Sequence, residues 1–168
     1  MSTQSLERAL KMAVVTGLRS ALGPALIARA GHSPDHSKLA LLAMGELVAD
    51  KLPFMPGRDT LLPTLARGAA GYWVAKQCAE RDGDNDPWIA PLGAVVAMGV
   101  AVFAPKLRNS LAWSTGMSQP VLGLIEDVIA LKLGTEATGL TLSDLSDTAK
   151  EAIGYARGEV QSRLAPVS

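Results

Sequence analysis

The chain has 168 residues, enough for one domain, and its 16 basic and 16 acidic side chains give no net formal charge. This balance, without a basic stripe interleaved with aromatic residues, argues against a nucleic-acid partner. The single cysteine, Cys78, excludes an internal disulfide and a cysteine-based metal site. No familiar catalytic or cofactor-binding motif is present, so we expect no enzyme, no cofactor and no metal.

Five apolar segments follow one another along the chain, and the content of small residues is typical of helices that pack closely in lipid. A spanning helix needs about 20 mostly apolar residues, which only the fourth segment supplies easily. The second and fifth are short and fit half-length or tilted helices. We therefore expect an all-α, small polytopic membrane protein with about five apolar helices, some short or broken. The segments cover residues 9–30, 38–52, 60–80, 87–111 and 118–133.

Glycine and proline mark two expected helix breaks. Gly17, Gly23 and Pro24 interrupt the first segment, where the glycines would permit a bend and the proline would free a backbone carbonyl. Gly116 and Pro120 mark a second break before the fifth segment. Unwound backbone at membrane depth is tolerated only where it is buried in protein or faces water, so the first break is a candidate polar site.

The charges of the loops predict a topology. With the N-terminus in the cytoplasm of a bacterium, the basic loops lie inside and the acidic loop 80–86 and the tail lie outside its inner membrane. Five spans follow from this alternation, and a re-entrant first or fifth segment would change that count. The N-terminus lacks a signal-peptide layout. The basic residues expected inside are Arg8, Lys11, Lys51, Arg58, Lys106 and Arg108.

The tail forms a second expected unit, so that residues 1–135 make the transmembrane domain and residues 136–168 an amphipathic helical tail. Gly134 is expected to stop the fifth helix, and Ser143 or Ser146 to cap the tail helix. Its apolar stripe would pack on the domain or mediate self-association, because the polar face is not enriched in lysine and arginine. The stripe comprises Leu142, Leu145, Ala149, Ile153, Ala156, Val160 and Leu164.

Charged residues inside the apolar segments predict a shared polar centre. Each charge at the middle of a bilayer costs about 2.5–3.5 kcal/mol, so these side chains must pair, line water or lie near the helix ends. We expect Arg19 and Arg67 to meet carboxylates of the second and fifth segments. Glu126 and Asp127 are adjacent, about 100° apart on a helix, and must face different surroundings. The expected centre comprises Arg19, Glu46, Asp50, Lys51, Arg67, Glu126 and Asp127.

Three elements together resemble a bacterial membrane-protein family called domain of unknown function 4126. They are Gly17-Leu-Arg19 with Pro24, the stretch Glu46-Leu-Val-Ala-Asp-Lys-Leu-Pro53, and Gly116 with Pro120 and Glu126-Asp127. The resemblance covers about residues 10 to 135. It implies an integral membrane protein in which the arginine, glutamate, aspartate and lysine positions form a common polar core. It implies no substrate.

Three functional interpretations remain open from the sequence. The first is a membrane protein, monomeric or a homo-oligomer such as a dimer, that moves or senses an ion or small polar solute through its charged centre. The second is a membrane scaffold or assembly protein with structural ion pairs and a partner-binding tail. The third is a soluble helical bundle in which many of these charges are solvated.

Overall fold

A computed structural model describes residues 2–49 and 61–164 of the chain, with side chains up to residue 162. The described residues form seven α-helices and no strand, which confirms the expected all-α class. The helices are α1 (Thr3–Leu18), α2 (Leu22–Ala30), α3 (His36–Ala49), α4 (Leu61–Arg81), α5 (Ile89–Thr115), α6 (Gln119–Thr138) and α7 (Leu142–Leu164).

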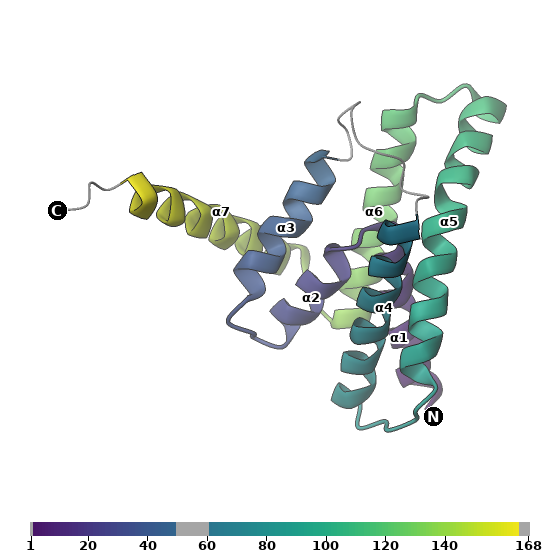
Figure 1. The fold of residues 1–168 in the computed structure, drawn as a ribbon, viewed down its shortest axis with the longest axis horizontal. Coiled ribbons are helices and arrows are strands. Elements are labelled where there is room, and N and C mark those ends of the chain that lie inside the picture. The colour runs from purple at the N-terminus through teal and green to yellow at the C-terminus, as the bar shows by residue number, and fades with distance from the viewer. Residues whose placement is uncertain (1, 50–60, 165–168) are drawn as a thin grey trace.

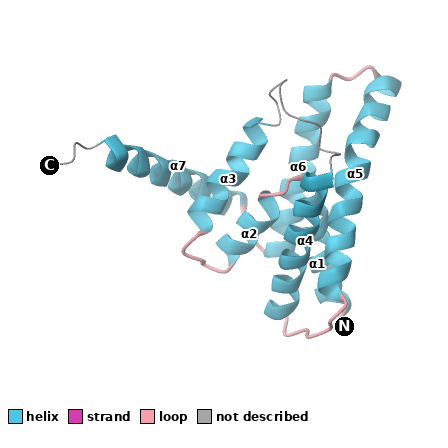
Figure 2. Ribbon diagram, viewed as in Figure 1, coloured by secondary structure: helices cyan, strands magenta, loops and turns pink. Residues whose placement is uncertain are grey.

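Four of these helices, α1, α4, α5 and α6, stand roughly parallel as a bundle (Figure 1). The short helices α2 and α3 lie beside the bundle, and α7 extends sideways from α3, so that the far end of α7 lies away from the other helices (Figure 2). The bundle therefore holds the main packing interfaces, while α7 is attached at one end only.

Two facing glycines let α4 and α5 approach closely. A Cβ atom added at Gly93 would lie 2.3 Å from the Ala75 Cβ and 2.8 Å from the Gly71 carbonyl oxygen. A Cβ at Gly71 would lie 2.4 Å from the Ala97 Cβ. Any side chain at either glycine would force the two backbones apart, so this small-residue face of α4 is a packing surface.

The distribution of side chains is inverted relative to a compact soluble domain. Much of the core consists of alanine and glycine, whereas many large apolar residues of α4, α5 and α6 point outward. The accessible surface is 9875 Å²; a compact monomer of 17.5 kDa would expose roughly 7,900 Å². The outward side chains of α4, α5 and α6 leave apolar surface for lipid or for another protein to cover. The outward residues of α5 and α6 include Leu92, Val95, Phe103, Leu107, Leu111, Val121, Leu124, Ile125, Val128 and Ile129.

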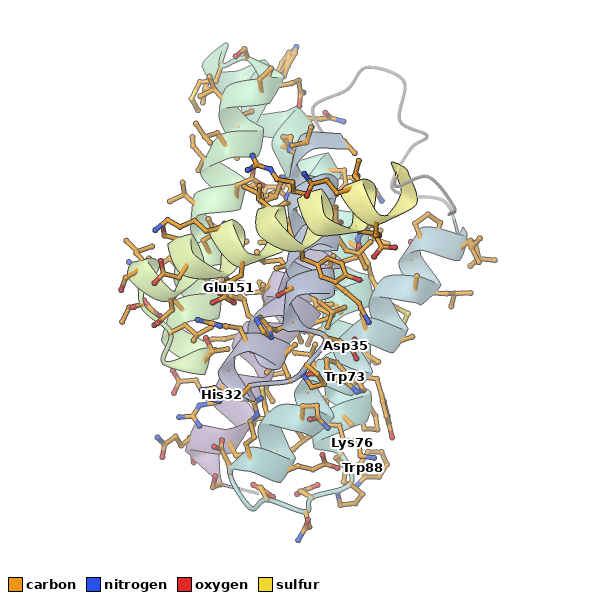
Figure 3. All side chains as sticks on the ribbon, turned by 90° about the vertical axis from the view of Figure 1, so that its left-hand side faces the viewer. His32, Asp35, Trp73, Lys76, Trp88 and Glu151 are labelled. Carbon is orange, nitrogen blue, oxygen red and sulfur yellow. The ribbon has the colours of Figure 1, made fainter. Side chains whose placement is uncertain are left out.

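Only α5, among the described residues, is long and apolar enough to cross a membrane by length and composition. Its 27 residues make a helix about 40 Å long. Trp88 caps its start, and Trp113, 92% exposed, lies near its end. Trp73 of α4 lies close to the Trp88 end (Figure 3). Tryptophans at both ends of an apolar helix are typical of the two interfaces of a bilayer.

The first apolar segment is a hairpin rather than a single span. The Ser2 backbone N–H donates to Asp84 (2.6 Å) and Arg8 pairs with Asp82, so the N-terminus lies against the loop after α4. At the other end of the hairpin, Arg81 donates to the Ile27 carbonyl of α2 (2.6 Å). Both arms therefore end on one side of the bundle. The five-span alternation put the N-terminus and loop 80–86 on opposite sides, whereas these contacts match the alternative of a re-entrant first segment.

The end of α6 and the start of α7 differ from the sequence-based expectation. Gly134 does not stop α6; it lies within the helix and makes room for Leu26. A Cβ atom added at Gly134 would lie 2.3 Å from the Leu26 Cδ1. The helix instead ends at Gly139, which adopts the left-handed conformation (φ 73°). Neither Ser143 nor Ser146 caps α7. Thr141 does, because its hydroxyl accepts from the Asp144 N–H (3.3 Å) while Asp144 accepts from the Thr141 N–H (2.8 Å).

Half of α7 packs on α3, and the contact face is turned by about one residue from the predicted stripe. Thr148 and Ala152 are the buried residues of this face, with Leu145 and Ala149 beside them. The predicted stripe positions Leu142, Ile153 and Val160 are exposed. The tail thus packs on the domain as expected near its start only, and its outer half offers apolar side chains to solvent or a partner.

Candidate functional site: a charged centre around a broken helix

The centre is built on the turn between α1 and α2. Helix α1 ends at Leu18 because Arg19 adopts an extended conformation (φ −138°, ψ 105°), and α2 begins at Leu22. The predicted break is therefore present, but its glycines do not bend the chain, since neither has a positive φ. Gly17 instead allows contact with α5, and Gly23 with Thr16. Pro24 lies inside the first turn of α2, where it breaks no helix.

The second predicted break is also present, between α5 and α6. Gly116 ends α5 in the left-handed conformation, with φ 70°. Pro120 lies in the first turn of α6, where a missing N–H costs nothing. Here a glycine does supply the special backbone conformation that the sequence predicts for it.

Glu46 of α3 caps the unwound turn. Its Oε1 accepts from the backbone N–H (2.9 Å) and the hydroxyl (2.8 Å) of Ser20, and its Oε2 accepts from the Ala21 N–H (2.7 Å). These amides begin α2, where the helix dipole is positive, and a carboxylate there is favourable. A residue of another helix therefore accepts the hydrogen bonds that a local N-cap side chain usually accepts.

Arg19 and Asp127 form the innermost ion pair. The Arg19 Nε donates to Asp127 Oδ1 (2.6 Å), and a second guanidinium nitrogen, Nη2, contacts the same oxygen. The two residues are 1% and 5% exposed. Charges so far from water are stable only as a pair with good geometry, so each residue depends on the other.

A second pair joins Arg67 of α4 to Glu46, with 3.8 Å between Nη2 and Oε1. Arg67 is buried as well. The predicted joining of Arg19 and Arg67 to carboxylates of the second and fifth segments is confirmed by these two contacts. Asp50 and Lys51, the other predicted members of the centre, lie outside the described residues.

Glu126 faces away from Asp127, as their adjacency predicts, and contacts Arg108 of α5. Sequence reasoning missed this role of Arg108, because it placed the residue in a cytoplasmic loop, whereas α5 continues to Thr115. Treating Arg108 as part of the fourth segment, 87–111, rather than as a loop residue would have brought it into consideration. The described centre thus contains three arginines and three carboxylates, which balance in formal charge.

A smaller polar cluster fixes α7 to the rest of the molecule. Glu151 accepts from Arg29 of α2 (3.1 Å) and lies 2.8 Å from His36 Nε2 at the start of α3 (Figure 3 labels Glu151). His32 and His36 flank the turn between α2 and α3, and His32 itself has a positive φ of 53°. No group of histidine, cysteine and carboxylate side chains suited to a metal occurs among the residues that were placed.

The ionic centre can hold charge inside an apolar bundle, because every carboxylate in it meets an arginine or backbone amides. No family model matches the chain, and neither a curated protein nor a solved structure matches it significantly.

Proposed function

We propose that the chain is a small helical membrane protein whose charged centre forms part of a path for an ion or small polar solute. The observation that carries the proposal is the re-entrant α1–α2 hairpin, whose unwound turn at Arg19 meets Glu46 and Asp127. Discontinuous helices with half-helix ends at the substrate site are characteristic of many transporters. The buried pairs would correspond to a closed state of the path.

The membrane location is supported by the outward apolar side chains of α4, α5 and α6 and by the tryptophans at the two ends of α5. Water would solvate this surface poorly, and a soluble monomer rarely exposes a contiguous apolar patch of such extent. The same surface disfavours the soluble-bundle alternative.

Flux measurements in proteoliposomes test the path. Glu46→Gln and Asp127→Asn keep the size of each side chain but remove its charge, so we expect proton or chloride flux, followed with encapsulated dyes, to fall towards the protein-free background. Glu151→Gln, on α7 and outside the centre, is the matched control and should retain the wild-type flux. Equal flux in all three variants and the wild type would count against a path through the centre.

A membrane scaffold is the second candidate, favoured by the way α7 projects from the bundle (Figure 1). Its outer half exposes Ile153 and Val160 together with charged residues, and such a helix needs water or protein around it rather than lipid. Deleting residues 142–168 should then abolish recovery of a cross-linked protein partner while the helical content of the bundle persists. A partner retained by the shortened chain would exclude this role for α7.

A further inference from the structure

A groove lies between α5 and α6, and neither the Arg19–Asp127 pair nor the Arg67–Glu46 pair lines it. Its volume is about 250 Å³, and it opens on the apolar face that these two helices expose. Above it, the Gln119 side chain donates to Asn109 Oδ1 (3.0 Å) and ties the helix ends together. The groove is lined by leucines and isoleucines of both helices, among them Leu107, Leu111, Leu122, Ile125 and Ile129.

One polar pair interrupts this apolar lining. Arg108 contacts Glu126 through Nη2, and both side chains are largely buried. The Arg108 Nε and the Glu126 Oε2, both shielded from solvent, form no hydrogen bond among the described residues. A buried donor without an acceptor costs about 1–3 kcal/mol, so an occupant that brings an acceptor oxygen would gain that amount.

The charge of the pair selects the kind of acceptor. Arg108 and Glu126 cancel each other, so an anionic head group would meet the Glu126 carboxylate without a spare positive charge. An uncharged oxygen, such as an ester carbonyl, satisfies the Arg108 Nε without that repulsion. The lining supplies room for an apolar chain and the Nε supplies one donor, which together describe an amphipathic ligand.

The depth of Arg108 also fits an ester group. Along the axis of α5, Arg108 lies about 7 Å before Trp113, the exposed residue near the end of the helix. Exposed tryptophans sit at the head-group level of a bilayer, and the ester carbonyls of glycerolipids lie just below that level. From Arg108 the groove continues along the bundle towards Ile129 and Leu18, in the direction of an acyl chain.

We infer that this groove is a lipid site that takes one acyl chain of a diacyl glycerophospholipid, with an ester carbonyl accepting from Arg108 Nε. The inference rests on the proposed membrane location and is independent of whether the charged centre conducts. A second copy of the chain is the competing occupant, and the experiment below separates the two.

Native mass spectrometry of protein released from dioleoylphosphatidylcholine nanodiscs counts the retained lipid. We expect one lipid per chain in the wild type. Ile125→Trp should fill the groove, whereas Leu124→Trp, exposed on the same helix outside the groove, is the matched control and should retain the lipid. Arg108→Lys keeps the charge but lacks the Nε donor, so its lipid occupancy should fall about tenfold.

Equal lipid retention in the wild type, Ile125→Trp and Arg108→Lys would overturn the inference. A lipid-free dimer that dissociates on Ile125→Trp would also overturn it and would assign the groove to a second copy. Quenching of the fluorescence of Trp88 and Trp113 by brominated lipid separates the groove site from the proposed membrane location. Quenching without a retained lipid contradicts the groove site alone, whereas the absence of quenching contradicts the membrane location as well.

Discussion

The Arg19–Asp127 pair is the residue-scale feature on which the centre depends. An ion pair at this burial gains little over a well-packed apolar pair, yet losing one partner leaves an uncompensated charge in the core. Arg19 is also the link between two elements, because it ends α1 and contacts α6. The pair therefore fixes the position of the hairpin against α6, whatever else it does.

Removing one charge of this pair should be more harmful than removing both. We expect Asp127→Leu to lower the free energy of unfolding by about 3–5 kcal/mol, and the double variant Arg19→Met/Asp127→Leu to recover most of that loss. Denaturant titration in detergent, followed by circular dichroism, measures both values. A double variant no more stable than the single one would show that the two residues do not act as a unit.

Asp84 gives a pH prediction at the same scale. The Ser2 backbone N–H, and then the Asp86 N–H, hold the pKa of Asp84 below its ordinary value. The contribution of the ionised Asp84 to folding stability is therefore complete above its unfolded pKa near 3.9. It is lost as the pH falls through the lower pKa of the folded state. The measurable quantity is the protection of the backbone amides in the first turn of α1 against hydrogen exchange. We expect this protection to be constant near neutral pH and to fall in acid below about pH 4. Asp84→Asn should remove this acid-dependent step; an unchanged step would assign it to another group.

At the scale of helices, the glycines divide into those that contact a neighbour and those that do not. Gly93→Ala should lower the free energy of unfolding by about 1–3 kcal/mol, because the added methyl group would overlap α4. Gly99→Ala, on the same helix with no other atom within 4 Å, should raise it by about 0.5–1 kcal/mol through helix propensity. Thermal unfolding of both variants in one detergent compares them. Equal effects would contradict the close approach of α4 and α5.

Local sequence signals predicted the elements better than their partners. The turn near Arg19 and the divergence of Glu126 and Asp127 follow from spacing alone, since they depend on helix geometry. Gly134 was misread as a stop because its role, making room for Leu26, involves a residue from another helix. Arg108 was missed because it was assigned to a loop, whereas α5 continues to Thr115.

For the whole molecule, the loop charges were compatible with more than one path of the chain. A re-entrant hairpin and a single span leave similar charge patterns, and only the contacts of Ser2 and Arg8 with the loop after α4 separate them. With both ends of the hairpin on that side, the basic residues Lys106 and Arg108 lie towards the opposite end of α5. The positive-inside rule does not select a side here, because Arg8 and Arg81 lie on the N-terminal side.

Cysteine labelling tests this arrangement, because the native Cys78 is buried and can be replaced by serine as a background. In right-side-out vesicles, Ser2→Cys and Asn85→Cys should react with a membrane-impermeant maleimide to the same extent. Ser118→Cys, in the connection between α5 and α6, should react from the opposite side of the membrane. Labelling of Ser2→Cys and Asn85→Cys from opposite sides would contradict the hairpin.

The 108 residues that separate Arg19 from Asp127 also set an order of assembly during synthesis. A ribosome adding 5–20 residues per second makes Asp127 roughly 5–20 s after Arg19. Glu46 follows Ser20 by only 26 residues, so the carboxylate cap of α2 is available early. The hairpin is thus shaped first, and its buried arginine receives Asp127 only when α6 emerges. Chains truncated before α6 should consequently be the preferred substrates of membrane quality-control proteases.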